Sequence, residues 1–193
     1  MTSQMELILK MIGSHLDCVQ YEALTSESKD DECINIGQAA RRGHLNCCIK
    51  FYKNGCPLNE EICKFAAEYG HLDVLQWAHA NGCPLDNWTC RYAAKCGYLE
   101  VLQWLHVNGC SWDEWTCAYA AKGGHLEVLQ WARANGCPWS EWTCAHAAQG
   151  GHLEVLQWLH ANGCPWNKWT CICAAVNGHL EVLQWAREPD VKL

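Results

Sequence analysis

Cysteine and histidine are the residue types of this 193-residue chain that could support chemistry, since it contains 16 Cys and 10 His. Thiolate and imidazole groups bind Zn²⁺ and also serve as the nucleophile and base of thiol enzymes. Many of the cysteines fall into two evenly spaced series: Cys83, Cys110, Cys137 and Cys164, and Cys63, Cys90, Cys117, Cys144 and Cys171. A catalytic residue is normally unique in its chain, whereas these residues are copies of one another. We therefore predict a protein that is not an enzyme and has no catalytic residues.

The strongest candidate metal ligands are His79, Cys83 and Cys90. Their spacing is His-x3-Cys-x6-Cys, without the Cys-x2-Cys pair that is typical of structural zinc sites. The counterparts of His79 in other copies include Arg133 and Arg187, which are poor metal ligands. We therefore expect the cysteines to be small buried apolar residues, with no metal site and no cofactor. The sequence does not exclude a disulfide between the two series within one copy. A thiol-rich metal-binding or redox protein is the alternative function.

A second set of histidines follows the glycines that separate successive copies: His44, His71, His125, His152 and His179. One copy has Tyr98 in this place, which argues against a chemical role. We expect these histidines to be turn residues that hydrogen-bond to a helix end or to neighbouring backbone.

Glycines at intervals of 27 residues define the repeat itself: Gly43, Gly70, Gly97, Gly124, Gly151 and Gly178. We divide a single repeat domain, residues 1–193, at these glycines. It comprises an N-terminal capping helix (1–13), a degenerate repeat (14–42), five repeats (43–69, 70–96, 97–123, 124–150 and 151–177) and a C-terminal half repeat (178–193).

Each repeat reads as two short helices, which the unit 124–150 illustrates. The first helix is apolar around most of its circumference and should end at Asn135-Gly136, because glycine accepts the left-handed conformation that follows a helix. Pro138 prevents its continuation, and Ser140 is a suitable N-cap for the second helix. Helices of about nine residues are marginal alone, so stability must come from stacked neighbours. We predict an all-α helical-repeat solenoid.

The string Ala120-Ala121-Lys122-Gly123-Gly124-His125-Leu126-Glu127-Val128-Leu129, followed by Asn135-Gly136-Cys137, resembles the ankyrin repeat. Ankyrin units have about 33 residues, and the six that are missing here fall where that family carries its β-hairpin finger. The resemblance therefore implies paired helices with shortened or absent fingers. The pattern is also similar to the short ankyrin-type repeats encoded by large DNA viruses of algae and other protists and by some protist genomes. It implies a protein-binding scaffold that uses the concave face lined by the second, inner helices.

Composition excludes several other classes of protein. The formal net charge is −7, which argues against nucleic-acid binding. The apolar runs are too short to span a membrane, and residues 1–12 do not form a secretory signal. We expect an intracellular, cytoplasmic monomer (in the host cytoplasm if the source is viral) whose partner is another protein.

The 12 tryptophans form three columns. The outer-helix column is Trp77, Trp104, Trp131, Trp158 and Trp185; the inner-helix column is Trp88, Trp115, Trp142 and Trp169; the loop column is Trp112, Trp139 and Trp166. We expect packing between repeats from the outer-helix column, and we expect the loop rings to pack over the next repeat. Exposed platforms for stacking nucleic-acid bases are the alternative, which the acidic charge disfavours.

The positions at which the copies differ identify the candidate binding surface, because the fold does not fix them. Three such positions lie four residues apart on the inner helix and therefore share a face. We expect cations there to meet an acidic segment of the partner and Ile172 to meet an apolar one. The candidate binding residues are Lys64, Arg91, Tyr92, Lys95, Glu114, Tyr119, Lys122, His146 and Ile172.

Overall fold

The computed structural model describes residues 33–187, in which all regular structure is helical. This confirms the prediction of an all-α helical-repeat fold. The chain divides into two compact units at the Pro84–Leu85 bond, and we describe each by itself. The expected capping helix at 1–13 and the first half of the degenerate repeat at 14–42 lie outside the described residues.

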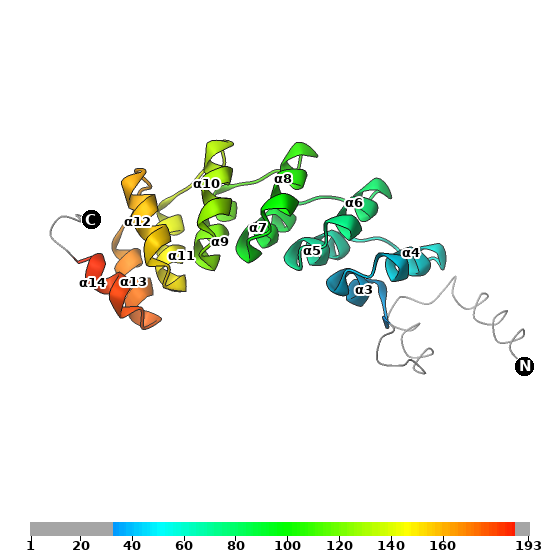
Figure 1. Ribbon diagram of the computed structural model, residues 1–193, viewed down its shortest axis with the longest axis horizontal. Coiled ribbons are helices and arrows are strands. Elements are labelled where there is room, and N and C mark those ends of the chain that lie inside the picture. Colours follow the sequence, from blue (N-terminus) through cyan, green and yellow to red (C-terminus); the bar gives the residue numbers. More distant parts are fainter. Residues whose placement is uncertain (1–32, 188–193) are drawn as a thin grey trace, which may run out of the picture. The chain divides into compact units, whose positions relative to one another are not determined.

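The described part of the N-terminal unit, residues 33–84, contains four helices. These are α3 (Ile36–Arg42), α4 (Leu45–Lys53), α5 (Glu60–Glu68) and α6 (Leu72–Ala80) (Figure 1). Helices α3 and α5 are the expected inner helices and pack against each other, while α4 and α6 are outer helices. Small side chains such as Ala39 and Ala66 are fully buried, so the helices can approach closely.

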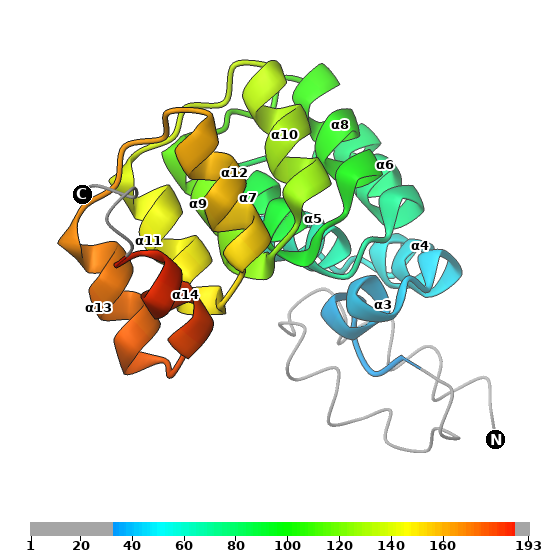
Figure 2. The same ribbon diagram turned by 60° about the vertical axis from the view of Figure 1, so that its left-hand side comes forward.

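Residues 85–187 of the C-terminal unit form four inner helices and four outer helices. The inner ones are α7 (Asn87–Cys96), α9 (Glu114–Gly123), α11 (Glu141–Gly150) and α13 (Lys168–Val176). The outer ones are α8 (Leu99–Val107), α10 (Leu126–Ala134), α12 (Leu153–Ala161) and α14 (Leu180–Trp185). Successive inner helices lie side by side, and each outer helix packs on the inner helix that precedes it (Figures 1 and 2).

The core of the C-terminal unit has two kinds of side chain. Inner helices contribute pairs of alanines such as Ala120 and Ala121, whereas outer helices contribute leucines such as Leu129, and all three are fully buried. Stacked copies therefore interlock small residues with large ones, which is how short helices bury enough apolar surface to be stable.

The helix ends follow the sequence signals. At the end of α10, the Asn135 side chain donates to the carbonyl of Trp131 at 2.9 Å, and Gly136 adopts a left-handed conformation with φ of 86°. Asp86, Asp113 and Asn167 accept backbone N–H groups at the starts of α7, α9 and α13, as expected for N-cap residues. Only residues 138–140 separate Cys137 from α11, so this loop has no room for a hairpin finger.

None of the helices described is long and apolar enough to cross a membrane. The longest have ten residues.

Candidate functional site

The inner helices of the C-terminal unit carry a row of aromatic side chains. We call the following set the inner aromatic row: Trp88, Tyr92, Trp115, Tyr119, Trp142, His146 and Trp169. Each inner helix places a ring at its second residue, and α7, α9 and α11 place another four residues later, on the same face. Trp88 and Trp169 are each 43% exposed and Trp142 is 39% exposed, so the row is an accessible apolar surface.

The rings of the row contact one another within and between helices. Trp88 lies 6.1 Å from Tyr92 on α7, measured between ring centroids. His146 on α11 meets Trp115 of α9 edge to face at 5.7 Å and Tyr119 at 6.2 Å. Trp142 and Trp169 join α11 to α13 at 6.2 Å. These contacts hold the rings in place, which reduces the conformational entropy that a binding partner would have to remove.

His146 is an uncharged member of the row. Burial lowers its pKa below the ordinary value of 6.5, and the nearby Lys122 charge lowers it further, whereas a hydrogen bond between Nδ1 and the Trp142 carbonyl opposes this. Since the pKa is lowered overall, the ring is neutral at pH 7 and adds to the apolar character of the row.

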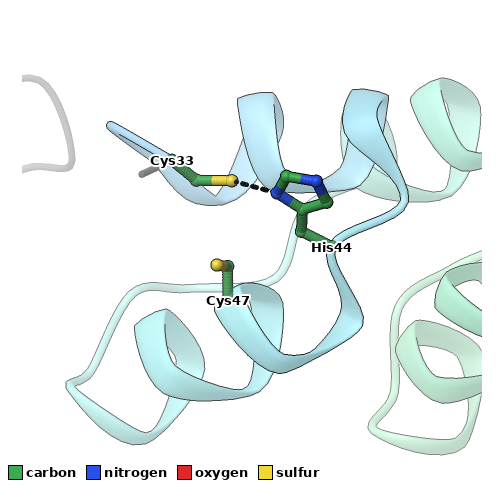
Figure 3. A group of neighbouring side chains, drawn as sticks. All are labelled: Cys33, His44 and Cys47. Atoms are coloured by element: carbon green, nitrogen blue, oxygen red, sulfur yellow. Dashed lines mark hydrogen bonds between the residues drawn. The ribbon is translucent and has the colours of Figure 1, made fainter. Parts of the chain in front are cut away.

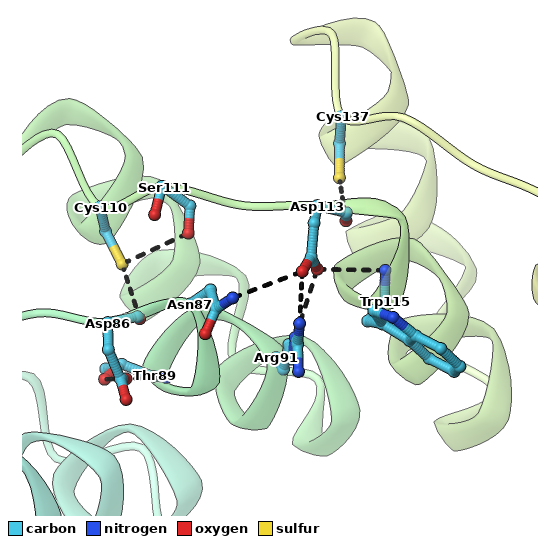
Figure 4. Close-up of polar contacts among 9 residues, drawn as sticks. All are labelled: Asp86, Asn87, Thr89, Arg91, Cys110, Ser111, Asp113, Trp115 and Cys137. Atoms are coloured by element: carbon cyan, nitrogen blue, oxygen red, sulfur yellow. Dashed lines mark hydrogen bonds and ion pairs between the residues drawn. The ribbon is translucent and has the colours of Figure 1, made fainter.

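Arg91 does not lie on this surface as a free cation. Its guanidinium forms an ion pair with both carboxylate oxygens of Asp113, and its Nε lies 3.2 Å from Oδ1 (Figure 4). Asp113 is also the N-cap of α9, where it accepts the N–H of Trp115 at 3.1 Å. Asp113 of the next repeat therefore already neutralises the charge of Arg91, and the expectation that Arg91 meets an acidic segment of a partner stays a prediction.

The other predicted positions divide into exposed and packed sites. Glu114 and Ile172 are exposed, while Lys95, Lys122 and Tyr119 are half-buried. Lys64 of the N-terminal unit is also half-buried, with its ammonium 5.8 Å from the Phe65 ring centroid.

Of the three inner-helix positions at which the copies differ, the middle one holds Lys64, Arg91 and Ile172 in α5, α7 and α13. In α9 and α11 this position is not on the accessible surface that we expected. Ala118 and Ala145 are fully buried there, because each of these helices has an inner helix packed on both sides. The aromatic positions beside them are the accessible ones.

The two cysteine series are buried, as expected, with the exception of the half-buried Cys171. Among the helices described, α13 has an inner helix packed on one side only, and its thiol Cys171 is correspondingly less covered. The loop cysteines also make a contact that the sequence does not reveal. Each thiol donates to the carbonyl of the residue that caps the inner helix of the preceding repeat, as Cys83 does to Asn59 at 3.0 Å and Cys110 to Asp86 at 3.1 Å (Figure 4).

Thiols of the two series also contact each other between neighbouring repeats. Cys90 Sγ lies 2.8 Å from Cys110 Sγ, and the described cysteines are free thiols. The pKa of Cys90 is raised by its hydrogen bond to Cys110 and by burial, so it is a poor nucleophile. Cys83 and Cys90, two of the candidate metal ligands, thus each have a thiol or carbonyl partner of their own.

Three of the turn histidines, His71, His152 and His179, have the structural role predicted for them. The Nε2 atoms of His71, His152 and His179 lie 2.9–3.0 Å from the carbonyls of Arg41, Lys122 and Gln149, each at the end of a preceding inner helix. These bonds tie the start of an outer helix to the end of an inner helix 30 residues earlier in the chain.

The outer-helix and loop tryptophans pack between repeats, as predicted. Trp112 lies 5.7 Å from Trp131, and Trp139 lies 6.0 Å from Trp158. His106 stacks on Trp112 at 4.1 Å, and Arg133 lies over Trp139 at 4.3 Å. Both imidazole and guanidinium are planar and stack on indole, so either His or Arg can occupy this position.

The N-terminal unit has two features of its own. A hollow between α3 and α5 is lined by residues including Asn35, Arg41 and Phe65, and the Arg41 guanidinium lies 3.9 Å from the Phe65 ring centroid. The second feature is a cluster in which Cys33, His44 and Cys47 come together (Figure 3). This trio was not predicted from the sequence, although Cys33 and Cys47 both depart from the two cysteine series.

Comparisons with known proteins agree with this architecture. A family model described as "Ankyrin repeats (many copies)" matches residues 63–106 and 144–187. The crystal structure of the human ASB11 ankyrin repeat domain is similar with a TM-score of 0.60 and 17% sequence identity, over 77% of this chain and 80% of that chain. No curated protein sequence matches the chain.

The stacked helix pairs, capped turns and buried small residues define a helical-repeat protein. The family model and the structural match confirm the recognition of the repeat: the chain contains ankyrin repeats at the two matched positions.

Proposed function

We propose that the chain is a non-enzymatic scaffold that binds a partner protein through the inner-helix face of its C-terminal unit. Ankyrin repeats generally mediate protein–protein interaction. The observation that carries the proposal is the inner aromatic row, with Trp88, Trp142 and Trp169 each about 40% exposed. Tryptophan and tyrosine are enriched among the residues that dominate binding energy at protein interfaces.

The chemistry of the face defines the kind of partner segment. Ile172 and Val176 are 40% and 80% exposed at the α13 end, which suits an apolar side chain. At α7, the Lys95 ammonium lies 5.9 Å from the Tyr92 ring centroid, so an acidic group can meet a cation beside an aromatic ring. Lys122 provides a second cation on α9. The partner would present a mostly apolar segment that carries an acidic residue.

The remaining parts of the proposal are an intracellular location, a monomeric chain and no nucleic-acid ligand. The net charge of −7 supports the last of these. A thiol-rich metal protein is the second candidate function, and the Cys33, His44 and Cys47 group is the observation that favours it.

Site-specific photocrosslinking tests the binding face. A photoreactive residue is placed at position 169 of the full chain and, as a control, at position 107, where Val107 is 83% exposed at the end of outer helix α8. A protein crosslinked in source-cell extract from position 169 and not from position 107 is then purified for affinity measurements. Crosslinking only from position 107 would refute the proposed face.

Affinity measurements with the purified partner test whether the inner aromatic row is the binding surface. Trp142→Ala and Trp169→Ala should each weaken binding by about tenfold or more, since truncation of a hot-spot aromatic costs about 2 kcal/mol or more. Lys95→Glu with Lys122→Glu should weaken it further, whereas Val107→Ser should leave it unchanged. Unchanged affinity in the tryptophan variants would contradict the proposal.

A further inference from the structure

Three metal-ligating side chains converge in the N-terminal unit. Cys33 precedes α3, His44 is the N-cap of α4, and Cys47 lies in the first turn of α4 (Figure 3). Their ligand atoms all lie within 4.8 Å of one another, and Cys33 Sγ is 3.0 Å from His44 Nδ1. Within residues 33–187, this is the one group of three or more His, Cys, Asp or Glu side chains that meets this criterion.

The separations fit tetrahedral zinc. Bonds of about 2.3 Å to sulfur and about 2.0–2.1 Å to nitrogen place ligand atoms about 3.5–3.8 Å apart. The observed separations, from 3.0 Å to no more than 4.8 Å, bracket that range. Small side-chain rotations would therefore bring all three atoms to bonding distance without moving the helices.

Comparison among the repeats shows that the two cysteines are exceptions to the pattern. Cys33 stands two residues before the N-cap of an inner helix, where four other copies have proline: Pro57, Pro84, Pro138 and Pro165. Cys47 stands in an outer helix where the other copies have valine: Val74, Val101, Val128, Val155 and Val182. The fold therefore requires cysteine at neither position.

His44 also differs from its counterparts. The Nε2 atoms of His71, His152 and His179 each lie close to a backbone carbonyl. The Nδ1 atom of His44 instead lies close to the sulfur of Cys33. His44 is exposed, while Cys33 is buried and Cys47 half-buried. A metal ion could thus enter from the solvent side, with water as its fourth ligand.

We propose that Cys33, His44 and Cys47 form a zinc-binding site. Thiolate and imidazole ligands select Zn²⁺ over Mg²⁺ and Ca²⁺, which prefer oxygen. Each thiol releases its proton to solvent as it binds, so one Zn²⁺ displaces two protons and nothing is oxidised. The ion would join the segment before α3 to the start of α4 and would stabilise this helix pair.

Cobalt substitution of the metal-stripped full chain tests the site under reducing conditions. Titration with Co²⁺ should give the visible absorption bands of a tetrahedral ion and a thiolate-to-cobalt charge-transfer band, which saturate at about one Co²⁺ per chain. Zn²⁺ should then displace the Co²⁺. Zn²⁺ should also raise the melting temperature, because it binds the folded state.

Matched variants assign the ligands. Cys47→Val introduces the residue of the other repeats, and His44→Tyr introduces the residue found at Tyr98, so both should fold. Each should weaken Co²⁺ and Zn²⁺ binding by more than the roughly 10–100-fold that loss of an outer-sphere partner costs. Cys33→Ser should do the same, while Cys173→Ser in the C-terminal unit should bind as wild type does.

Two outcomes would overturn the proposal. One is the absence of tetrahedral cobalt bands in the wild-type chain. The other is uptake that Cys47→Val and Cys33→Ser leave unchanged, which would assign the metal to other thiols. Circular dichroism of each variant confirms that it is folded, and Cys47→Val decides the matter if Cys33→Ser does not fold.

Discussion

At the scale of the residue, the abundant cysteines are hydrogen-bonding core residues. A loop thiol such as Cys137 fills a small buried space and donates to the Asp113 carbonyl at 3.4 Å. Alanine, which the ankyrin family has here, would fill less of the space and donate nothing. Repetition of this contact between successive repeats explains why one cysteine appears in copy after copy.

The buried thiols should make the free energy of unfolding decrease at alkaline pH. The pKa of Cys137 is raised above its ordinary value of 9.0 by a hydrogen bond with Cys117 and by burial. Its contribution is fully present below about pH 9 and is lost as the pH rises from there toward the raised value, because only the unfolded chain then loses the proton. In this pH range the free energy of unfolding should fall by about 1.4 kcal/mol per pH unit for each such thiol.

Cys137→Ala provides the test of this pH dependence. Urea unfolding under reducing conditions at pH 7, 9 and 10 should show a free energy of unfolding that falls less steeply above pH 9 than in wild type. The variant should also lose about 1 kcal/mol at pH 7, where the thiol donates its hydrogen bond. Val107→Ser should keep the wild-type slope, and an identical slope in Cys137→Ala would contradict the prediction.

At the scale of the element, the repeats are joined where helices end. Gly124 follows α9 with φ of 77°, and the His152 ring lies so close that an added Cβ would be 2.5 Å from Nδ1. The same ring reaches the Lys122 carbonyl at 3.0 Å. One glycine therefore meets two requirements, a left-handed conformation and room for the histidine of the next repeat.

Alanine substitutions separate these two requirements. Gly136→Ala should cost about 1–2 kcal/mol, since Gly136 has φ of 86° and nothing within 4 Å of a Cβ. Gly124→Ala should cost clearly more, because the conformational penalty and the clash with His152 add. Combined with His152→Ala, the Gly124→Ala penalty should fall to the Gly136 value.

Urea unfolding of the four variants completes this double-mutant cycle. If Gly124→Ala and Gly136→Ala lowered the free energy of unfolding equally, the contact with His152 would not contribute to the cost of Gly124→Ala.

The sequence predicts most of these elements because the chain repeats. Copies share their caps, turns and core positions, so the α10 end at Asn135-Gly136 could be predicted from the sequence. The site was less predictable, because it depends on which residues of different repeats meet. The Arg91–Asp113 pair requires α7 to lie beside the start of α9. The Cys33, His44 and Cys47 trio requires that the start of α4 pack near the segment before α3, which spacing alone does not show.

At the scale of the whole molecule, the C-terminal unit is a stack in which helices contact mainly their neighbours. Within residues 85–187, helices α9 and α11 have inner helices on both sides, whereas α13 has one on a single side. The difference is visible in burial, since Ala121 and Ala148 are fully buried while their counterpart Ala175 is exposed. In such arrays, stability is the sum of terms for each repeat and for each interface between neighbours.

Local unfolding should therefore proceed from the α13–α14 end of this unit. Hydrogen exchange followed by mass spectrometry should show backbone amides of α13 and α14 exchanging at least about tenfold faster than those of α9 and α11, since the end pair has one interface fewer to break. Leu156→Ala in α12, which removes a fully buried side chain, should accelerate exchange in α11 through α14 more than in α7. Uniform protection across the unit would instead mean that its repeats open together as one cooperative body. A gradient would mean that the exposed surface around Ile172 and Val176 lies on the least stable part of the stack, where binding of a partner would have the largest effect on protection.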